Sequence, residues 1–477
     1  MGVDFAGKKV ILFGTGAIYQ KFKEYAFKKG EVIALADNDK AKQGGVIDGV
    51  IVIAPESIVG QKYDYVALFL KYESAVQVRR QLVSLGAEEN KILFYDEYVA
   101  NACRGEYKVY EPERKPHIAI VSVLGLGYHG SAIAVFSAAI AMRGLGHSIT
   151  MIAPSCDKKF AKECNAFGIE LVEWPSFLCM SDDELSFLKR FDFVIVNTVP
   201  SVDLAAKISL VKPMFWWLHE PSFGNGISNI LCRYPCYKND SRIRQIPVFA
   251  VSHVARRAFL EYFPDCNVGI LPYCVHDEAG SAVSFSRDKR PVAFALIANF
   301  FELKQQTLFL EVAARLEREM PGKCRFLLIG NAGASEYAKK VAAMAAQIPS
   351  VELCGVFTRA QMKDTYANQI DVVVCPSLEE CLPTVIAEGM MWSKLCVCSD
   401  NTGMAEYITD GENGFICKTG DLNSLYEKMR CCAENFDELD FVRQNARRTY
   451  EENFTMDVFA DRVEKLFDKC GVTQNQS

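Results

Sequence analysis

The stretch that decides the fold reads SLEECLPTVIAEGMM and covers residues 377–391. It follows a strand-like run, DVVVCP at 371–376, and its second half has the pattern of a helix. Glu380 and Glu388 therefore lie at a strand-to-helix junction. Ligands of open parallel sheets bind at the carboxyl ends of strands. A carboxylate there can accept hydrogen bonds from sugar or ribose hydroxyls, while amides at a helix start face phosphate oxygens.

The same alternation of strand and helix extends upstream of this stretch. Strand-like runs at 291–297, 325–329 and 351–353 alternate with helical patterns at 306–319 and 336–347. Alternation of this kind indicates a parallel sheet covered by helices. We therefore expect an α/β fold.

Two further strand-and-glycine starts precede this region, at 9–16 and at 117–130, and the chain of 477 residues is too long for one core. Residues 101–116 are polar and contain Pro112 and Pro116, which is typical of a linker. The boundaries that we predict are 1–100 for an accessory Rossmann-like domain, 101–116 for the linker, 117–285 and 286–450 for two further Rossmann-like lobes, and 451–477 for a helix returning toward the first of these lobes and a polar tail.

Composition excludes several classes of protein. A net charge of -6 argues against nucleic-acid binding, because no strong basic surface is available for phosphates. The longest apolar run, 132–142, is far shorter than the ~20 residues that cross a bilayer, and the first residues lack an apolar signal core. We therefore expect a cytoplasmic protein with no transmembrane segment, for which peripheral contact with the inner membrane face stays open.

The cysteines and histidines give no pattern of a metal site. The chain has 18 cysteines and 6 histidines, but no Cys-x-x-Cys pair and no clustering of the two types at ligand spacing. Several cysteines, including Cys375, Cys396 and Cys398, lie in strand-like runs, where a thiol acts as a small buried hydrophobe. We expect structural thiols and no metal.

Residues on both sides of this stretch add to the signature around Glu380. Lys304 ends the loop after the strand-like run at 291–297, and Gly403-x-x-Glu406 follows a further strand-like run. With the two glutamates, this order and spacing resemble the retaining family 4 glycosyltransferases, which have the GT-B fold of two Rossmann-like lobes. The resemblance covers about residues 117–470. It implies a GT-B pair of lobes preceded by a third, small Rossmann-like domain.

The resemblance implies roles for residues of the C-terminal lobe. Lys304 matches one of two cations that hold the donor diphosphate, but Asn299 stands where the other cation is expected. Glu388 matches the carboxylate that binds ribose, and Glu380 the one near the donor sugar. Gly355 matches the loop facing the nucleotide base. The amides around Cys381, Leu382, Pro383 and Thr384 would face sugar and phosphate.

The preceding lobe would hold the acceptor. Gly127 and Gly130 resemble a glycine-rich loop whose amides approach the donor phosphate without a side-chain clash. His219 ends the strand-like run 214–218 and matches a histidine of the family that lies in the cleft near the donor sugar. Packing beneath the neighbouring tryptophans is the alternative for this histidine.

The N-terminal segment has a partial dinucleotide fingerprint. Gly14 and Gly16 follow a strand and open a helix, and Asp37 comes 23 residues after Gly14. The third glycine is absent, because Tyr19 takes its place. Nucleotide binding and a purely structural role both remain open for this segment.

The activity implied by the resemblance is transfer of a hexose-type unit from a nucleotide-sugar to a hydroxyl of a glycan or lipid-linked acceptor, with retention of configuration. No cofactor and no metal are expected, since the single Asp-x-Asp, Asp37–Asp39, lies in the accessory segment. Two alternatives stay open. The same fold could hydrolyse or epimerise a nucleotide-sugar, and Asn299 could mark a lobe that binds the donor without turnover.

Overall fold

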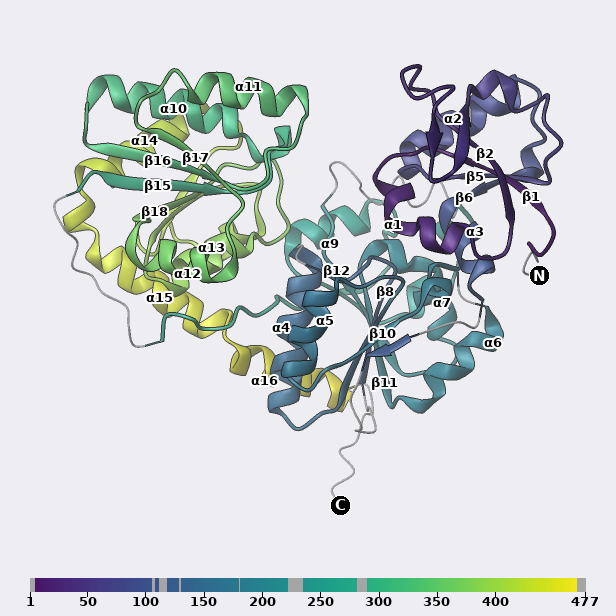
Figure 1. Cartoon of the computed structure of the whole chain (residues 1–477). Coiled ribbons are helices and arrows are strands. Elements are labelled where there is room, and N and C mark those ends of the chain that lie inside the picture. The colour runs from purple at the N-terminus through teal and green to yellow at the C-terminus, as the bar shows by residue number, and fades with distance from the viewer. Residues whose placement is uncertain are drawn as a thin grey trace.

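The computed structural model describes residues 5–104, 108–110, 118–127, 130–179, 181–221, 235–280 and 290–469. They form three α/β units, each built on its own sheet (Figure 1). The first unit is purple in this view, the second lies below it in teal, and the third, in green, stands on the other side of the second. The mixed α/β class expected from the sequence is confirmed.

The first sheet has the order β3-β4-β2-β1-β5-β6 and is parallel apart from the short pair β3–β4. Its strands are β1 (Lys9–Phe13), β2 (Glu31–Ala36), β3 (Val46–Ile47), β4 (Val50–Ile53), β5 (Tyr65–Leu68) and β6 (Ile92–Phe94). Its helices are α1 (Ala17–Ala26), η1 (Pro55–Ser57), α2 (Tyr72–Ser84), η2 (Glu89–Lys91) and α3 (Tyr95–Ala102). Helix α3 was not apparent from the sequence. It begins where Glu97 accepts the Phe94 N–H at 3.1 Å.

The second sheet has the order β14-β13-β12-β11-β8-β9-β10-β7 and is parallel except where β7 meets β10. Its strands are β7 (Lys108–Tyr110), β8 (Ile118–Ser122), β9 (Ile149–Ala153), β10 (Glu170–Glu173), β11 (Phe193–Asn197), β12 (Met214–Leu218), β13 (Val248–Ala250) and β14 (Val268–Ile270). Its helices are α4 (Gly130–Gly144), α5 (Lys158–Ala166), η3 (Pro175–Cys179), α6 (Asp182–Leu185), η4 (Ser186–Arg190), η5 (Val199–Ser201), α7 (Val202–Ile208), η6 (Pro235–Asn239), η7 (Ile243–Gln245) and α9 (His253–Leu260). Strand β7 falls within 101–116, so part of the expected linker pairs with this sheet.

The third sheet has the order β17-β16-β15-β18-β19-β20, with parallel pairing throughout its described strands. Its strands are β15 (Val292–Ile297), β16 (Cys324–Ile329), β17 (Val351–Gly355), β18 (Val372–Cys375), β19 (Leu395–Ser399) and β20 (Phe415–Cys417). Its helices are η8 (Glu302–Lys304), α10 (Gln306–Glu319), α11 (Glu336–Ala345), α12 (Arg359–Asn368), α13 (Thr384–Met391), η9 (Gly403–Tyr407), α14 (Leu422–Glu434) and η10 (Phe436–Glu438). The helix predicted at 306–319 is confirmed.

The last two helices join the third unit back to the second. Helix α15 (Asp440–Asn453) lies against the third unit, and α16 (Met456–Lys469) packs along α4 (Figure 1). The Phe467 ring lies 5.4 Å from the His147 ring and 5.0 Å from the Phe193 ring. Phe459 lies 5.6 Å from Trp217. The helix predicted near the C-terminus therefore completes the core of the second unit.

Chain order places a switch point in the second sheet and another in the third sheet. In the second sheet β8 lies between β9 and β11, and in the third sheet β15 lies between β16 and β18. The crossovers leave in opposite directions on the two sides of β8 and of β15. Crevices for ligands form at the carboxyl ends of strands at such points. The residues that follow β8, β11, β15 and β18 are therefore the places to look for a site.

The second and third units also touch directly. The His253 N–H donates to Glu406 at 3.0 Å, and the Arg257 guanidinium donates to Asn401 at 2.8 Å. The Tyr273 hydroxyl donates to the Leu382 carbonyl. These contacts bring the carboxyl edge of the second sheet up to the segment that precedes α13.

Candidate functional site

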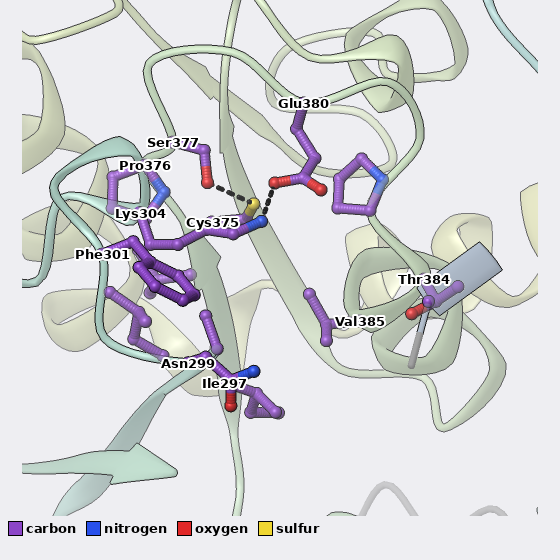
Figure 2. Close-up of a pocket in the computed structure, with 15 residues that line it drawn as sticks. Ile297, Asn299, Phe301, Lys304, Cys375, Pro376, Ser377, Glu380, Thr384 and Val385 are labelled. Atoms are coloured by element: carbon purple, nitrogen blue, oxygen red, sulfur yellow. Dashed lines mark hydrogen bonds and ion pairs between the residues drawn. The ribbon is translucent and has the colours of Figure 1, made fainter. Parts of the chain in front are cut away.

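A cavity of about 280 Å³ opens at the switch point of the third sheet. Its lining comes from the ends of β15 and β18, from the start of α13, and from Gly130 at the start of α4 in the second unit. Figure 2 shows these side chains, among which Lys304 and Glu380 point toward one another. The residues that line it and that the sequence singled out are Gly130, Asn299, Lys304, Glu380, Pro383 and Thr384.

Lys304 and Glu380 form an ion pair across this cavity. Both side chains keep about a quarter of their surface accessible, at 25% and 23%. Burial lowers the pKa of Lys304, but the Glu380 carboxylate outweighs it and holds that pKa above its usual range. The lysine is therefore a fixed positive charge at neutral pH. The sequence predicted that Glu380, Glu388 and Lys304 converge on one crevice. The structure brings Lys304 and Glu380 together, whereas Glu388 lines neither of the cavities described here.

Backbone contacts explain why the two side chains meet although 76 positions separate them. The Leu378 N–H donates to the Leu303 carbonyl at 2.9 Å, which joins the loop after β18 to η8. The Gly403 N–H donates to the Glu380 carbonyl at 2.9 Å. A Cβ atom at Gly403 would overlap the Cys381 carbonyl, so this close approach requires glycine.

The amino end of α13 faces the same cavity. Pro383 is its N-cap and provides no side-chain cap, so the amides of the first turn are not satisfied by a capping side chain. Thr384 and Val385 line the cavity from this turn. Partial positive charge at a helix start and the Lys304 ammonium together favour an anion such as a phosphate.

A second cavity, of about 340 Å³, shares four lining residues with the first. The shared residues are Gly130, Glu380, Pro383 and Thr384. The second cavity is also lined by His219, Glu220, Tyr273, Cys381 and Leu382. The two cavities therefore form one crevice between the second and third units, with Glu380 at the junction.

His219 lies in this crevice and also packs on an aromatic ring, so both interpretations of the sequence hold in part. Its ring is 4.6 Å from Trp217, and among the described residues its Nε2 has no hydrogen-bond partner. Burial lowers the pKa of His219 to about 3, so the imidazole is neutral at physiological pH. It can exchange hydrogen bonds with a ligand but does not supply a charge.

Glu220 lies beside His219 in this crevice. Its Oε2 accepts the Val199 N–H at 2.9 Å and the His219 N–H at 3.0 Å. Burial raises the pKa of Glu220 to about 7, and these backbone hydrogen bonds only partly oppose that rise. The carboxyl group is therefore close to half protonated at neutral pH.

Glu388 is held apart from both cavities. Its carboxylate accepts from Arg359 at 2.8 Å and from the Tyr366 hydroxyl at 3.1 Å, while Arg359 also donates to Glu278 at 2.8 Å. Gly355, with a φ of 72°, ends β17 four positions before Arg359. A ligand at Glu388 would have to share this carboxylate with Arg359. Neither Glu388, Gly355 nor Gly127 lines the two cavities described above.

Asn299 lines the first cavity while its side chain supports the neighbouring loop. Its Oδ1 accepts the Asn331 N–H at 3.1 Å, and its carbonyl accepts from Gln306 at 3.0 Å. The position that usually carries a second cation therefore has a loop-bracing amide. Lys304 is left as the cation of this cavity among the lining residues that the structure describes.

In the glycine loop of the first unit, the Asp37 carboxylate is hydrogen-bonded by residues of the same unit. Asp37 accepts from the Thr15 N–H at 3.1 Å, the Thr15 hydroxyl at 2.5 Å and Lys42 at 3.1 Å. Burial opposes ionisation, but these hydrogen bonds hold the pKa of Asp37 below its usual range. Gly14 has a φ of 95°, and a Cβ there would lie 2.9 Å from the Phe69 carbonyl. Beside Gly16 there is open space.

Two searches of the described part of the chain gave negative results. No group of three or more His, Cys, Asp or Glu side chains there could hold a metal ion. Nor does any helix in those residues combine the length and apolar character needed to span a bilayer. The strand thiols Cys375, Cys396 and Cys398 are buried and unoxidised.

Comparison with protein families matches two parts of the chain. Residues 292–435 match the family described as glycosyl transferases group 1. Residues 6–93 match a family described as C2185-like, N-terminal. The first of these matches covers most of the third unit.

Comparison with individual proteins agrees with this assignment. The putative glycosyltransferase EpsD of Bacillus subtilis is 29% identical over 180 residues, which are 35% of this chain and 43% of that protein. The N,N'-diacetylbacillosaminyl-diphospho-undecaprenol alpha-1,3-N-acetylgalactosaminyltransferase of Campylobacter jejuni is 26% identical over 197 residues, 38% of this chain and 46% of that protein. The chain thus spans less than half the length of these curated relatives.

A solved structure extends the likeness to the second unit. Anabaena HepE in complex with UDP-glucose superposes with a TM-score of 0.60 at 16% identity, covering 74% of this chain and 99% of that one. At this identity the likeness concerns the fold. The second and third units together have the GT-B fold that the sequence predicted.

Proposed function

We propose that this chain is a retaining, metal-independent glycosyltransferase of family 4. It transfers a hexose-type unit from a nucleotide-sugar to a hydroxyl of a glycan or lipid-linked acceptor. The observation that carries the proposal is the Lys304–Glu380 pair, held at the uncapped start of α13 in a crevice that also contains Gly130 of the facing lobe. A cation, helix-start amides and a carboxylate are the groups that a sugar diphosphate requires.

The donor binds chiefly to the third unit. Lys304 and the amides from Cys381 to Thr384 hold the diphosphate, and Glu380 accepts hydrogen bonds from the sugar. Glu388 binds the ribose hydroxyls and Gly355 faces the base, while Asn299 offers hydrogen bonds without charge. The Lys304–Glu380 contact in the free protein supports this arrangement, since each group already lies where its ligand partner would enter.

Catalysis rests on orientation and on stabilisation of the leaving group. The bond from the anomeric carbon to the diphosphate breaks, and the acceptor oxygen bonds to that carbon on the same face. The acceptor proton passes to the departing diphosphate oxygen, so no protein nucleophile forms a bond. Lys304 and the α13 amides stabilise the charge that develops on the diphosphate. His219 contributes hydrogen bonds as a neutral ring.

The relatives indicate the substrate classes to test. The Campylobacter relative is named for an acceptor carried on diphospho-undecaprenol, and the Anabaena structure is a complex with UDP-glucose. For this chain we propose a nucleotide-sugar donor with no further cofactor, and an acceptor approached from the second unit. The protein would work in the cytoplasm, with peripheral contact at the inner membrane face where the acceptor is lipid-linked.

The three units would have separate tasks. Residues 1–100 form the accessory module, 117–285 the acceptor lobe and 286–450 the donor lobe, with 451–477 returning to the acceptor lobe. The packing of α16 on α4 supports the last of these boundaries.

A donor screen tests the proposal. The purified chain is heated with sugars activated by UDP, GDP, ADP and dTDP, and the stabilised pair is then supplied with acceptors. We expect one nucleotide to raise the melting temperature and the product to keep the donor's anomeric configuration by NMR, with activity unaffected by EDTA. Free sugar or an epimer as the main product would favour the hydrolytic or epimerising alternative. Binding without turnover of any acceptor would favour a donor-binding protein.

A further inference from the structure

The N-terminal module lies on the carboxyl edge of the acceptor lobe. Helix α3 packs against η3, and Arg104 pairs with Glu184 at 2.9 Å. From α1, the Tyr25 hydroxyl donates to Glu173, the last residue of β10. The contact thus covers the end of the second sheet at which its parallel strands finish (Figure 1).

Lys21, one turn before Tyr25 on α1, reaches the switch point of that sheet. Its Nζ lies against Gly125, which follows β8: a Cβ atom placed on Gly125 would be 2.6 Å from it. The Ser155 hydroxyl, after β9, is even closer to that point. An ammonium group from the accessory module is therefore placed at the ends of β8 and β9, beside the Ser155 hydroxyl.

Lys21 has no counter-ion in this position. Its side chain is exposed, and no carboxylate in the described part of the chain pairs with it. Two other lysines of the module are paired, Lys23 with Asp48 at 2.9 Å and Lys42 with Asp37 at 3.1 Å. The surrounding protein partly shields Lys21 from water and so lowers its pKa, and no anion among the residues that the structure describes offsets this effect.

The nearby carboxylate does not neutralise it. Glu173 accepts from the Tyr25 hydroxyl with one oxygen and from the Cys156 N–H, at 3.2 Å, with the other. This carboxylate therefore holds the module onto the lobe through neutral donors. The ammonium of Lys21 remains available to a ligand.

The neighbouring strand presents unsatisfied polar atoms at the same edge. Asn197 and Thr198 end β11, which pairs with β8, and both are nearly fully buried at 1% and 0% exposure. Within the described structure Asn197 Oδ1 and Thr198 Oγ1 have no hydrogen-bond partner. Thr198 also has a φ of 70°, which is unusual for a residue other than glycine. Strain and unmet hydrogen bonds of this kind are typical of ligand sites.

Chain geometry connects this edge with the crevice. Gly125 and Gly130 are five positions apart in the sequence, so at most about 18 Å separates them. Gly130 lines both cavities of the crevice. An acceptor whose hydroxyl lies beside Glu380 can therefore extend another group as far as Lys21.

We propose that Lys21, with the Ser155 hydroxyl beside it, binds a phosphate group of the acceptor. The N-terminal module thus completes the acceptor site of the neighbouring lobe. This inference rests on the proposed transferase function. The phosphate could come from a lipid-linked acceptor or from a soluble sugar phosphate, and the chemistry of recognition is the same for both.

The test is a titration of the full chain with UDP present to occupy the donor side. The probes are inorganic phosphate, farnesyl phosphate and glucose 1-phosphate, with farnesol as the uncharged control, and binding is measured by calorimetry. We expect Lys21→Ala to weaken phosphate binding about tenfold or more, because a charge-assisted hydrogen bond is lost. Lys21→Arg retains the charge and should bind within about threefold of the wild type.

Lys23→Ala is the matched control, since it removes a cation two positions along the same helix and should leave phosphate binding unchanged. Tighter binding of farnesyl phosphate supports a lipid-linked acceptor, and tighter binding of glucose 1-phosphate supports a soluble one. Equal phosphate affinity in Lys21→Ala and the wild type, or no phosphate binding by the wild type, overturns the proposal. Stabilisation by nucleotide-sugars is read separately in the same variants, so failure of the donor function is distinguished from failure of this site.

Discussion

The cavity of the third unit and the glycine loop of the N-terminal module are both built from a parallel strand, a loop and a helix, but they differ in what occupies them. In the third unit the ends of β15 and β18 border a cavity of about 280 Å³ with a lysine, a carboxylate and a helix start. In the module the carboxylate of Asp37 is used by Thr15 and Lys42. One junction is open to a ligand, while the other is largely satisfied by its own chain.

The difference shows that a glycine pattern is not enough for a site. Gly14 is needed for its positive φ and for the close approach of the Phe69 carbonyl, which are requirements of packing. At the donor junction Gly403 has a packing role too, but it leaves Lys304 and Glu380 accessible. The two junctions differ in free space and in the polar groups that a ligand could reach, and not in the spacing of their glycines.

The largest expected effect is at the open junction. Lys304→Ala should lower turnover at least about tenfold, or about 1.4 kcal/mol in the barrier, because the leaving diphosphate loses its cation. Initial rates at saturating donor measure this. Lys339→Ala, an exposed lysine of the same lobe paired with Glu336, is the control and should keep wild-type activity. Wild-type turnover in Lys304→Ala would remove the basis of the site assignment.

A smaller effect is expected at Glu388, whose carboxylate is bonded to Arg359 in the free protein. Glu388→Ala should weaken nucleotide-sugar binding about fivefold to tenfold through loss of the ribose hydrogen bonds. Glu278→Ala removes the other carboxylate bonded to Arg359 and serves as the matched control. If both variants weaken binding equally in calorimetry, Glu388 acts by positioning Arg359 and not by contacting the ribose.

The buried Glu220 of the crevice should lower the stability of the folded protein at neutral and higher pH, whereas Asp37 in the glycine loop should not. Burial raises the pKa of Glu220 from 4.5 to about 7, so the folded protein favours the neutral acid. The stability penalty is absent below pH 4.5 and grows as the pH rises to about 7. Glu220→Gln, which keeps the acceptor oxygen, should stabilise the protein by about 1 kcal/mol at pH 8 and not at pH 4. Denaturant unfolding at the two pH values measures this, and equal stability at pH 8 would contradict it.

The smallest functional effect is expected at the glycine loop of the N-terminal module. Asp37→Asn should leave donor binding and turnover unchanged, while it lowers the stability of the module by about 1 kcal/mol at neutral pH. Because the pKa of Asp37 is lowered by folding, this loss should fade as the pH falls below the ordinary range of an aspartate. A variant that loses nucleotide binding would show that the module has a site of its own.

Periodicity and local motifs predicted much of the fold and part of the site. The helix at 306–319 has the predicted bounds, since its apolar spacing and the preceding loop are both local signals. The meeting of Lys304 with Glu380 was predicted because both follow strands of one parallel sheet. The roles of these residues toward a donor, like those of Gly127, Gly355 and Glu388, remain predictions.

Contacts between units could not be predicted from local sequence. Helix α3 follows β6 directly, so its start at Tyr95 was interpreted as the end of a strand. Tyr273, Arg359 and Tyr366 have no motif of their own, and their partners are distant in the chain. The sequence does not distinguish Lys21 from the other lysines, because only the packing of two units places it beside Gly125.

The return of α16 to the second unit has a consequence for how the chain is made. Phe459, Val463 and Phe467 are buried, at 0 to 2% exposure, in the core that surrounds β8, although they come from the last helix of the chain. During synthesis, the second unit must therefore wait, partly assembled, until the third unit has been translated and α16 emerges to close it.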